Sequence, residues 1–244
     1  LHFDRKLMGD WMRRPIRTMG YIHALKQALR QQGYDRVYDL QGLFRSAICS
    51  WWTRASHRVR SQSSREMGGF LFHQQHAIDP DCQHTVDQML ALLVTDGIEE
   101  ASEPADLQLY LDQADQQWRN RLLADAGISP GSYAIIAPTS QWRSKCWPID
   151  RFAAVTLRLL RGGEGLPAMD KVFLSSAPGE RAYVAKLYGH LQQSGMSRDE
   201  AEQRVLFPET SVGRMSALIE SAGLVLGNDS AALHIAVGFD RPFV

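Results

Sequence analysis

The sequence predicts an α/β fold built around parallel sheets. In the second half of the chain, short apolar runs alternate with longer segments whose apolar residues recur at helical spacing. Strands that alternate with helices in this way are typical of β-α-β units, in which the strands pair in parallel. The expected strands are residues 133–137, 171–174, 204–207 and 224–226, and the expected helices are residues 150–160, 180–191 and 215–220.

The first half contains one clear unit of the same kind. A helix is expected over residues 16–32, where apolar residues recur at helical spacing, and Gly33 follows at a C-cap position. A strand at residues 36–40 and a second helix at residues 43–53 complete the unit.

Polar residues follow the strand of this first unit. Asp39, Gln41 and Arg45 lie at or just after its carboxyl end, the side on which open α/β sheets bind ligands. Asp39 is explained equally well as a carboxylate that stabilises the turn.

Two stretches have little pattern. Residues 1–15 are expected to form a loop, with Trp11 and Met12 as its buried residues. Residues 54–83 are the most basic part of the chain and are expected to form a loop that suits a phosphate or carboxylate, although a solvated loop explains the charge as well. The histidines of this stretch lack the spacing of metal ligands, so no metal site is predicted.

Two further helices and a connector precede the second half. Apolar spacing predicts helices at residues 84–94 and 111–126, joined by an acidic connector at residues 97–107. The change of pattern near residue 128 places a domain boundary there, which gives domains of residues 1–128 and 129–244.

Composition narrows the function classes. The 244 residues include 27 Lys and Arg against 27 Asp and Glu, so no basic field favours nucleic acid, and any anion must be bound locally. Cys49, Cys82 and Cys146 are odd in number and widely separated, which argues against a disulfide framework and favours a reducing compartment. No apolar run approaches the roughly 20 residues that span a bilayer, and residues 1–17 are too charged for a signal peptide. A cytoplasmic protein is expected.

Three loops of the second half are the candidate functional site. They contain Thr139 and Ser140 with Lys145, residues 177–180, and residues 228–234. Because each loop follows a strand, all three lie at the same edge of a parallel sheet. The hydroxyls, lysine, histidine and helix N-termini gathered there suit a diphosphate. The chain has neither G-x-G-x-x-G nor G-x-x-x-x-G-K-[ST], which argues against a dinucleotide dehydrogenase and a P-loop ATPase or GTPase.

The third of these loops has a simpler interpretation. Asp229 and Ser230 precede an alanine-rich helix, and both residue types commonly cap helix N-termini. His234 then lies on a face of that helix. Judged by themselves, these residues are better explained as a cap than as a ligand site.

Several short motifs together resemble a known family. They are Y-D-R-V-Y-D-L-Q-G-L-F-R-S-A at 34–47, S-R-E-M at 64–67, Q-H-T-V-D at 83–87, A-P-T-S-Q-W-R-S-K-C-W-P at 137–148, S-S-A-P-G-E at 175–180 and N-D-S-A-A-L-H-I-A at 228–236. In this order and spacing, the chain resembles the ADP-heptose:lipopolysaccharide heptosyltransferases of glycosyltransferase family 9, and heptosyltransferase I in particular. The resemblance implies the GT-B architecture of two Rossmann-like domains with parallel sheets.

The resemblance also implies an activity. It is the transfer of a heptose from ADP-heptose to the inner core of a lipopolysaccharide precursor, with inversion and without a metal or other cofactor. The first domain is expected to bind the acceptor and the second the nucleotide sugar, and the resemblance allows peripheral contact with the cytoplasmic face of the inner membrane. The donor-binding residues implied are Thr139, Ser140, Lys145, Glu180, Asp229, Ser230, Ala231 and His234, and the acceptor-binding residues are Gln41, Arg45 and Arg65.

Departures from the family pattern limit the assignment. The family's N-terminal strand, the loop with its catalytic Asp, and its C-terminal helices have no counterpart in the sequence, so a fragment is expected and no catalytic residue is assigned. Ala231 replaces a common Gly, and Thr210 stands where some relatives carry an apolar residue. Two alternatives stay open: a noncatalytic nucleotide-binding α/β module, and a GT-B transferase with a UDP or GDP donor.

Overall fold

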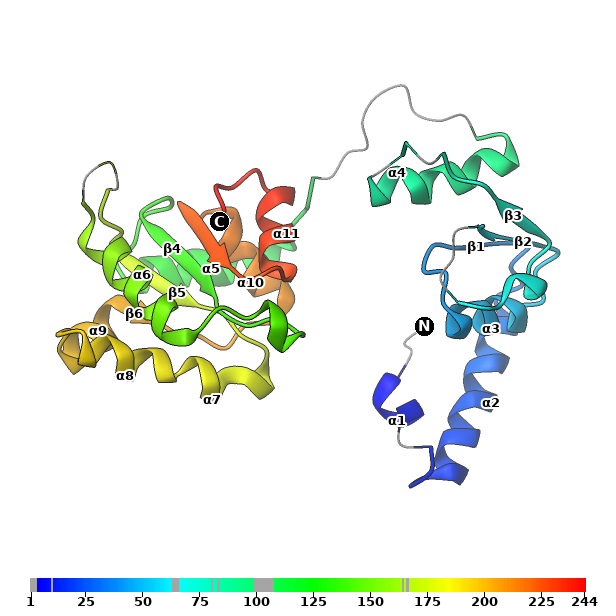
Figure 1. The fold of residues 1–244 in the computed structure, drawn as a ribbon, viewed down its shortest axis with the longest axis horizontal. Helices are drawn as coiled ribbons and strands as arrows, with labels where there is room; N and C mark the ends of the chain where they lie inside the picture. Colours follow the sequence, from blue (N-terminus) through cyan, green and yellow to red (C-terminus); the bar gives the residue numbers. More distant parts are fainter. Residues whose placement is uncertain are drawn as a thin grey trace. The chain divides into compact units, whose positions relative to one another are not determined.

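The computed structural model divides the chain into two compact units, Leu1–Asp106 and Leu107–Val244 (Figure 1). It describes residues 4–9, 11–62, 66–79, 81, 82, 84–98, 108–163, 165 and 167–244. The boundary lies earlier than the predicted residue 128, because α5 (Gln113–Asp125) belongs to the second unit. In that helix Arg119 pairs with Glu220, and Leu123 joins the core of the second sheet.

The first unit contains a small parallel sheet in the order β1-β2-β3. Its elements are α1 (Arg5–Gly9), α2 (Pro15–Gln31), β1 (Arg36–Asp39), α3 (Phe44–Trp52), β2 (His57–Ser61), the 3-10 helix η1 (Gly69–Leu71), β3 (Gln74–His76), α4 (Thr85–Leu90) and the 3-10 helix η2 (Ala91–Asp96).

Two strands lie within residues 54–83, so the prediction of a basic loop there was wrong. β2 escaped detection because its sequence, H-R-V-R-S, has Val59 as its one aliphatic residue. Arg60 is nevertheless 3% exposed, and its guanidinium lies over the Phe72 ring at 5.4 Å from the ring centroid. An arginine whose stem and planar head pack against apolar atoms breaks the alternation by which a buried strand is recognised.

The second unit is a four-stranded parallel sheet in the order β6-β5-β4-β7, which confirms the predicted α/β class. Its elements after α5 are β4 (Tyr133–Ala137), the 3-10 helix η3 (Arg143–Lys145), α6 (Ile149–Arg161), β5 (Lys171–Leu174), the 3-10 helix η4 (Pro178–Glu180), α7 (Arg181–Val184), α8 (Lys186–Gln193), α9 (Arg198–Arg204), β6 (Val205–Leu206), α10 (Val212–Glu220), β7 (Leu224–Gly227) and α11 (Ala231–Gly238).

Helices cover both faces of this sheet. Alternate residues of β4 enter two separate core clusters, one completed mainly by α6 and α8 and the other by α5, α10 and α11. In the second cluster Tyr133 meets Phe173 edge to face at 5.1 Å, and its hydroxyl donates to the Leu218 carbonyl oxygen at 2.5 Å. Burial raises the pKa of Tyr133 to about 12, so the hydroxyl stays protonated. Among the described residues, no helix combines the length and apolar character needed to cross a bilayer.

Candidate functional site

A cleft of about 450 Å³ opens at the carboxyl edge of the second sheet. The loops after β4, β5 and β7 and the start of α10 line it, as parallel topology requires. Among the predicted donor residues, the cleft is lined by Thr139, Ser140, Glu180, Ser230 and Ala231. Thr210 lines it too, from the segment before α10.

The turn after β7 fits closely against the end of β4. A Cβ atom on Gly227 would lie 2.9 Å from the Ala137 carbonyl oxygen, so a side chain there would push the two strand ends apart. The next residue, Asn228, is 6% exposed, and its Oδ1 accepts a hydrogen bond from the Trp147 amide at 2.9 Å. Asn228 therefore joins the loops after β4 and β7, a role that the sequence analysis missed.

The N-terminus of α11 faces this cleft without a side-chain cap. Ser230 is the N-cap residue in extended conformation, but its hydroxyl makes no capping hydrogen bond. Ser230 therefore occupies the N-cap position, but the prediction that its side chain caps the helix was wrong. First-turn N–H groups that no side chain satisfies, together with the helix dipole, favour an anion at this position.

Asp229 instead forms a charged cluster with Lys145 and His234. Lys145 Nζ donates to Asp229 Oδ2, and His234 Nε2 lies 3.8 Å from Asp229 Oδ1. The Lys145 ammonium, by hydrogen bond and by charge, lowers the pKa of Asp229, and His234 adds a smaller contribution. All three side chains are exposed, and exposed ion pairs contribute little to the stability of a fold. The cluster is therefore a better candidate for binding a ligand than for stabilising the second unit.

Ser140 connects this cluster to the cleft. Its Oγ donates to the Asp229 carbonyl oxygen at 3.1 Å, while its side chain also lines the cleft. At another part of the lining, Glu180 Oε2 accepts from the Ala177 amide at 3.3 Å, which satisfies one N–H group at the start of η4. The structure thus brings every predicted donor residue to one edge of the sheet. Their individual roles stay predictions.

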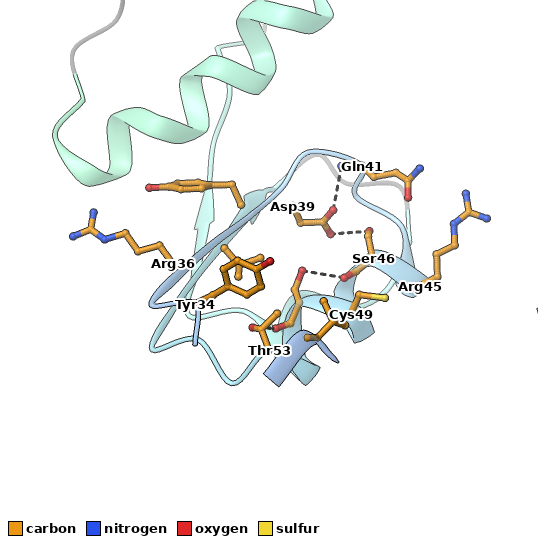
Figure 2. A pocket seen from close by; sticks show the side chains of 12 residues that line it. Tyr34, Arg36, Asp39, Gln41, Arg45, Ser46, Cys49 and Thr53 are labelled. Carbon is orange, nitrogen blue, oxygen red and sulfur yellow. Dashed lines mark hydrogen bonds between the residues drawn. The ribbon is translucent and has the colours of Figure 1, made fainter. Parts of the chain in front are cut away.

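In the first unit, Asp39 is occupied by its own turn (Figure 2). The carboxylate is 5% exposed, and it accepts from the Gln41 and Gly42 amides, both at 3.1 Å, and from Ser46 Oγ at 3.0 Å. These bonds favour the turn-stabilising interpretation of Asp39.

Gln41 and Arg45 line a groove of about 580 Å³ along β1. Figure 2 shows both side chains extending away from the Tyr34 end of this groove. Within the described part of the chain, the Arg45 guanidinium has no ion pair, so its charge is available to an anion. Arg65, the third predicted acceptor residue, lies outside the described residues.

The segment just after Arg65 is anchored to the start of α3. Glu66 Oε2 accepts from the Phe44 amide at 2.6 Å, and the Glu66 carbonyl oxygen accepts from the buried Arg60 at 3.1 Å. Glu66 therefore satisfies an N–H group at the N-terminus of α3 that has no partner within the helix. That N–H belongs to Phe44, the residue before Arg45. The sequence signal for it was the glutamate of S-R-E-M.

No group of three or more His, Cys, Asp or Glu side chains that suits a metal ion occurs in the described ranges. The expectation of a reaction without a metal stays a prediction.

Comparison with known proteins places the chain in a family. The family Glycosyltransferase family 9 (heptosyltransferase) matches residues 22–244. Lipopolysaccharide heptosyltransferase 2 of Salmonella typhimurium is 24% identical over 231 residues, which cover 93% of this chain and 63% of the relative. Lipopolysaccharide heptosyltransferase 3 of Escherichia coli is 26% identical over 230 residues, covering 92% and 62%. The chain thus spans less than two thirds of the length of these relatives.

Solved structures agree with the fold. E. coli heptosyltransferase WaaC, solved with ADP-2-deoxy-2-fluoro heptose, has a TM-score of 0.71 at 21% identity over 98% of this chain and 69% of its own. E. coli ADP-heptose lps heptosyltransferase II has a TM-score of 0.68 at 19% identity over 92% and 66%. These neighbours confirm the predicted GT-B fold class with parallel sheets. The chain belongs to glycosyltransferase family 9, the heptosyltransferases.

Proposed function

We propose that this protein transfers a heptose from ADP-heptose to the inner core of a lipopolysaccharide precursor, with inversion and without a metal. The observation that carries the proposal is the convergence of Lys145 and the uncapped α11 N-terminus at one edge of the second sheet. Support comes from the family match and from a structural neighbour solved with an ADP-heptose analogue.

The proposed chemistry is a single displacement at the anomeric carbon. An acceptor hydroxyl oxygen would form the new glycosidic bond from the face opposite the diphosphate and pass its proton to a general base, a role to which no residue of this sequence is assigned. As the bond from that carbon to the diphosphate oxygen breaks, negative charge accumulates on the departing ADP. Lys145 and the α11 N-terminus, with Ser230, Ala231 and His234 beside it, would stabilise that charge, and fixed charges and dipoles of this kind supply much of the rate enhancement of many enzymes. Asp229 would position Lys145 and bind the heptose hydroxyls. Thr139 and Ser140 would contact the phosphates. Glu180 would bind the ribose.

Two arginines and a glutamine complete the acceptor side of the proposal. Gln41, Arg45 and Arg65 would bind the acidic sugar of the precursor, and charge-assisted hydrogen bonds from arginine suit its carboxylate and phosphates. The proposed location is the cytoplasm, with peripheral contact at the inner membrane. No nucleic acid partner and no cofactor is proposed.

The test is a transfer assay with ADP-heptose and a heptose-free inner-core precursor. A product heavier by one heptose, released together with ADP and formed equally in EDTA, is the expected result. Binding of ADP without any product would favour the noncatalytic module. Faster transfer from a UDP or GDP sugar would favour the other GT-B alternative, since Thr210 leaves the choice of base open.

Replacing Arg65 with alanine should raise the KM for the acceptor about 10- to 100-fold, the cost of one hydrogen bond to a charged group. Donor affinity should not change, because the residue addresses the acceptor's charge alone. Steady-state kinetics and calorimetry with ADP measure the two effects. Arg54→Ala, in the same basic stretch, is the matched control. A change in donor affinity alone would contradict the assignment.

A further inference from the structure

Helix α2 exposes two of the large apolar side chains whose spacing predicted the helix. Ile16 is 87% exposed and Met19 is 70% exposed, whereas Thr18 and Leu25 are buried on the opposite side of the helix. In the turn before the helix, Trp11 is 60% exposed and Met12 is 76% exposed, contrary to the expected burial of both.

The packing of α1 explains this orientation. α1 (Arg5–Gly9), a short helix within the stretch 1–15 that was predicted to be a loop, lies beside α2 (Figure 1). Thr18 Oγ1 donates to the Leu7 carbonyl oxygen at 3.3 Å, and the Asp4 amide donates to the Tyr21 hydroxyl at 2.8 Å. These contacts turn the Thr18 side of α2 inward, so Ile16 and Met19 are directed outward.

The same surface is strongly basic. Arg13, Arg14 and Arg17 are all exposed, and residues 11–34 contain neither Asp nor Glu. Within the described ranges, none of the three arginines forms an ion pair. Because the whole chain is neutral, this is a local concentration of positive charge. We define the 11–19 face as these arginines together with Trp11, Met12, Ile16 and Met19.

The chemistry of the 11–19 face selects its partner. Apolar side chains flanked by arginines, with a tryptophan among them, suit the boundary between acyl chains and anionic headgroups. A second copy of the chain packed symmetrically on this face would oppose arginine with arginine, which is unfavourable.

We propose that the 11–19 face docks on a bilayer that contains anionic lipids, with Trp11, Met12, Ile16 and Met19 at the acyl boundary and the arginines on the headgroups. This inference rests on the proposed function and extends it, because the proposed acceptor is itself a membrane lipid.

The test is co-sedimentation with vesicles of phosphatidylcholine, with and without phosphatidylglycerol. The protein should bind the mixed vesicles, and binding should weaken with salt. Each surface cation contributes roughly a fivefold change in partition, so the combined change Arg13→Gln, Arg14→Gln and Arg17→Gln should lower partition about 100-fold. Ile16→Ser with Met19→Ser should lower it as well. In vesicles of brominated lipid, Trp11 fluorescence should be quenched, and Trp11→Phe should remove that component.

The matched control changes the same charge elsewhere: Arg121→Gln, Arg161→Gln and Lys186→Gln, all exposed in the second unit. It should bind like the unaltered protein. Equal binding to both vesicle types, or unchanged binding of the arginine variant, would overturn the proposal. So would a dimer that dissociates on Ile16→Ser without any vesicle binding. Calorimetry with ADP separates the two proposals, since vesicle binding needs no donor and a folded variant should keep its ADP affinity.

Discussion

Replacing Lys145 with alanine is expected to lower kcat for heptose transfer by roughly 10²- to 10³-fold, the loss typical of one preorganised charge stabiliser. The residue supplies the one cation that hydrogen bonds to Asp229 at the tip of α11 in the described structure. Charge on the departing ADP is greatest in the transition state, so kcat should fall more than the affinity for ADP-heptose. ADP binding should also weaken, because the free diphosphate carries the same charge.

Steady-state kinetics and calorimetry with ADP measure these effects. Lys186→Ala, an exposed lysine whose ammonium lies 5.7 Å from the Tyr183 ring centroid, is the control and should be unchanged. Lys145→Arg should restore part of the rate, because it returns the charge with a different geometry. If Lys145→Ala bound ADP as tightly and turned over as fast as the unaltered protein, Lys145 would have no role at the diphosphate.

The second sheet was predictable because its residues obey one simple rule. All five residues of β4, Tyr133–Ala137, are buried and apolar. A strand that is covered on both faces therefore reads in the sequence as a continuous apolar run. Loops after such strands share an edge, so the sequence alone predicted that Lys145 and Asp229, 84 positions apart, lie together.

The features that were missed depend on contacts between distant segments. Burial of Arg60 requires the Glu66 carbonyl and the Phe72 ring, and neither is visible in the pattern of β2. Asn228 looks like an ordinary turn residue until its side chain meets the Trp147 amide. The domain boundary was misplaced because the few apolar residues of α5 do not reveal which sheet they cover.

Replacing Phe152 with alanine is expected to lower the free energy of unfolding of the second unit by about 3–5 kcal/mol. Phe152 is 1% exposed in the core under α6, and its ring meets that of Trp147 edge to face at 5.2 Å and 77°. Urea denaturation measures the loss. Because Trp147 follows Lys145 closely and bonds to Asn228, removing the ring should also loosen the loop and weaken ADP binding.

Leu160→Ala separates these two effects. Leu160 is 1% exposed in the same core cluster but lies at the opposite end of α6, away from Trp147. Its truncation should cost about 2–5 kcal/mol of stability and leave the ADP affinity of the folded protein unchanged. If Phe152→Ala and Leu160→Ala altered stability alike and neither changed ADP affinity, the Trp147–Phe152 contact would serve the core alone. A weaker affinity in Phe152→Ala only would show that core packing positions the Lys145 loop.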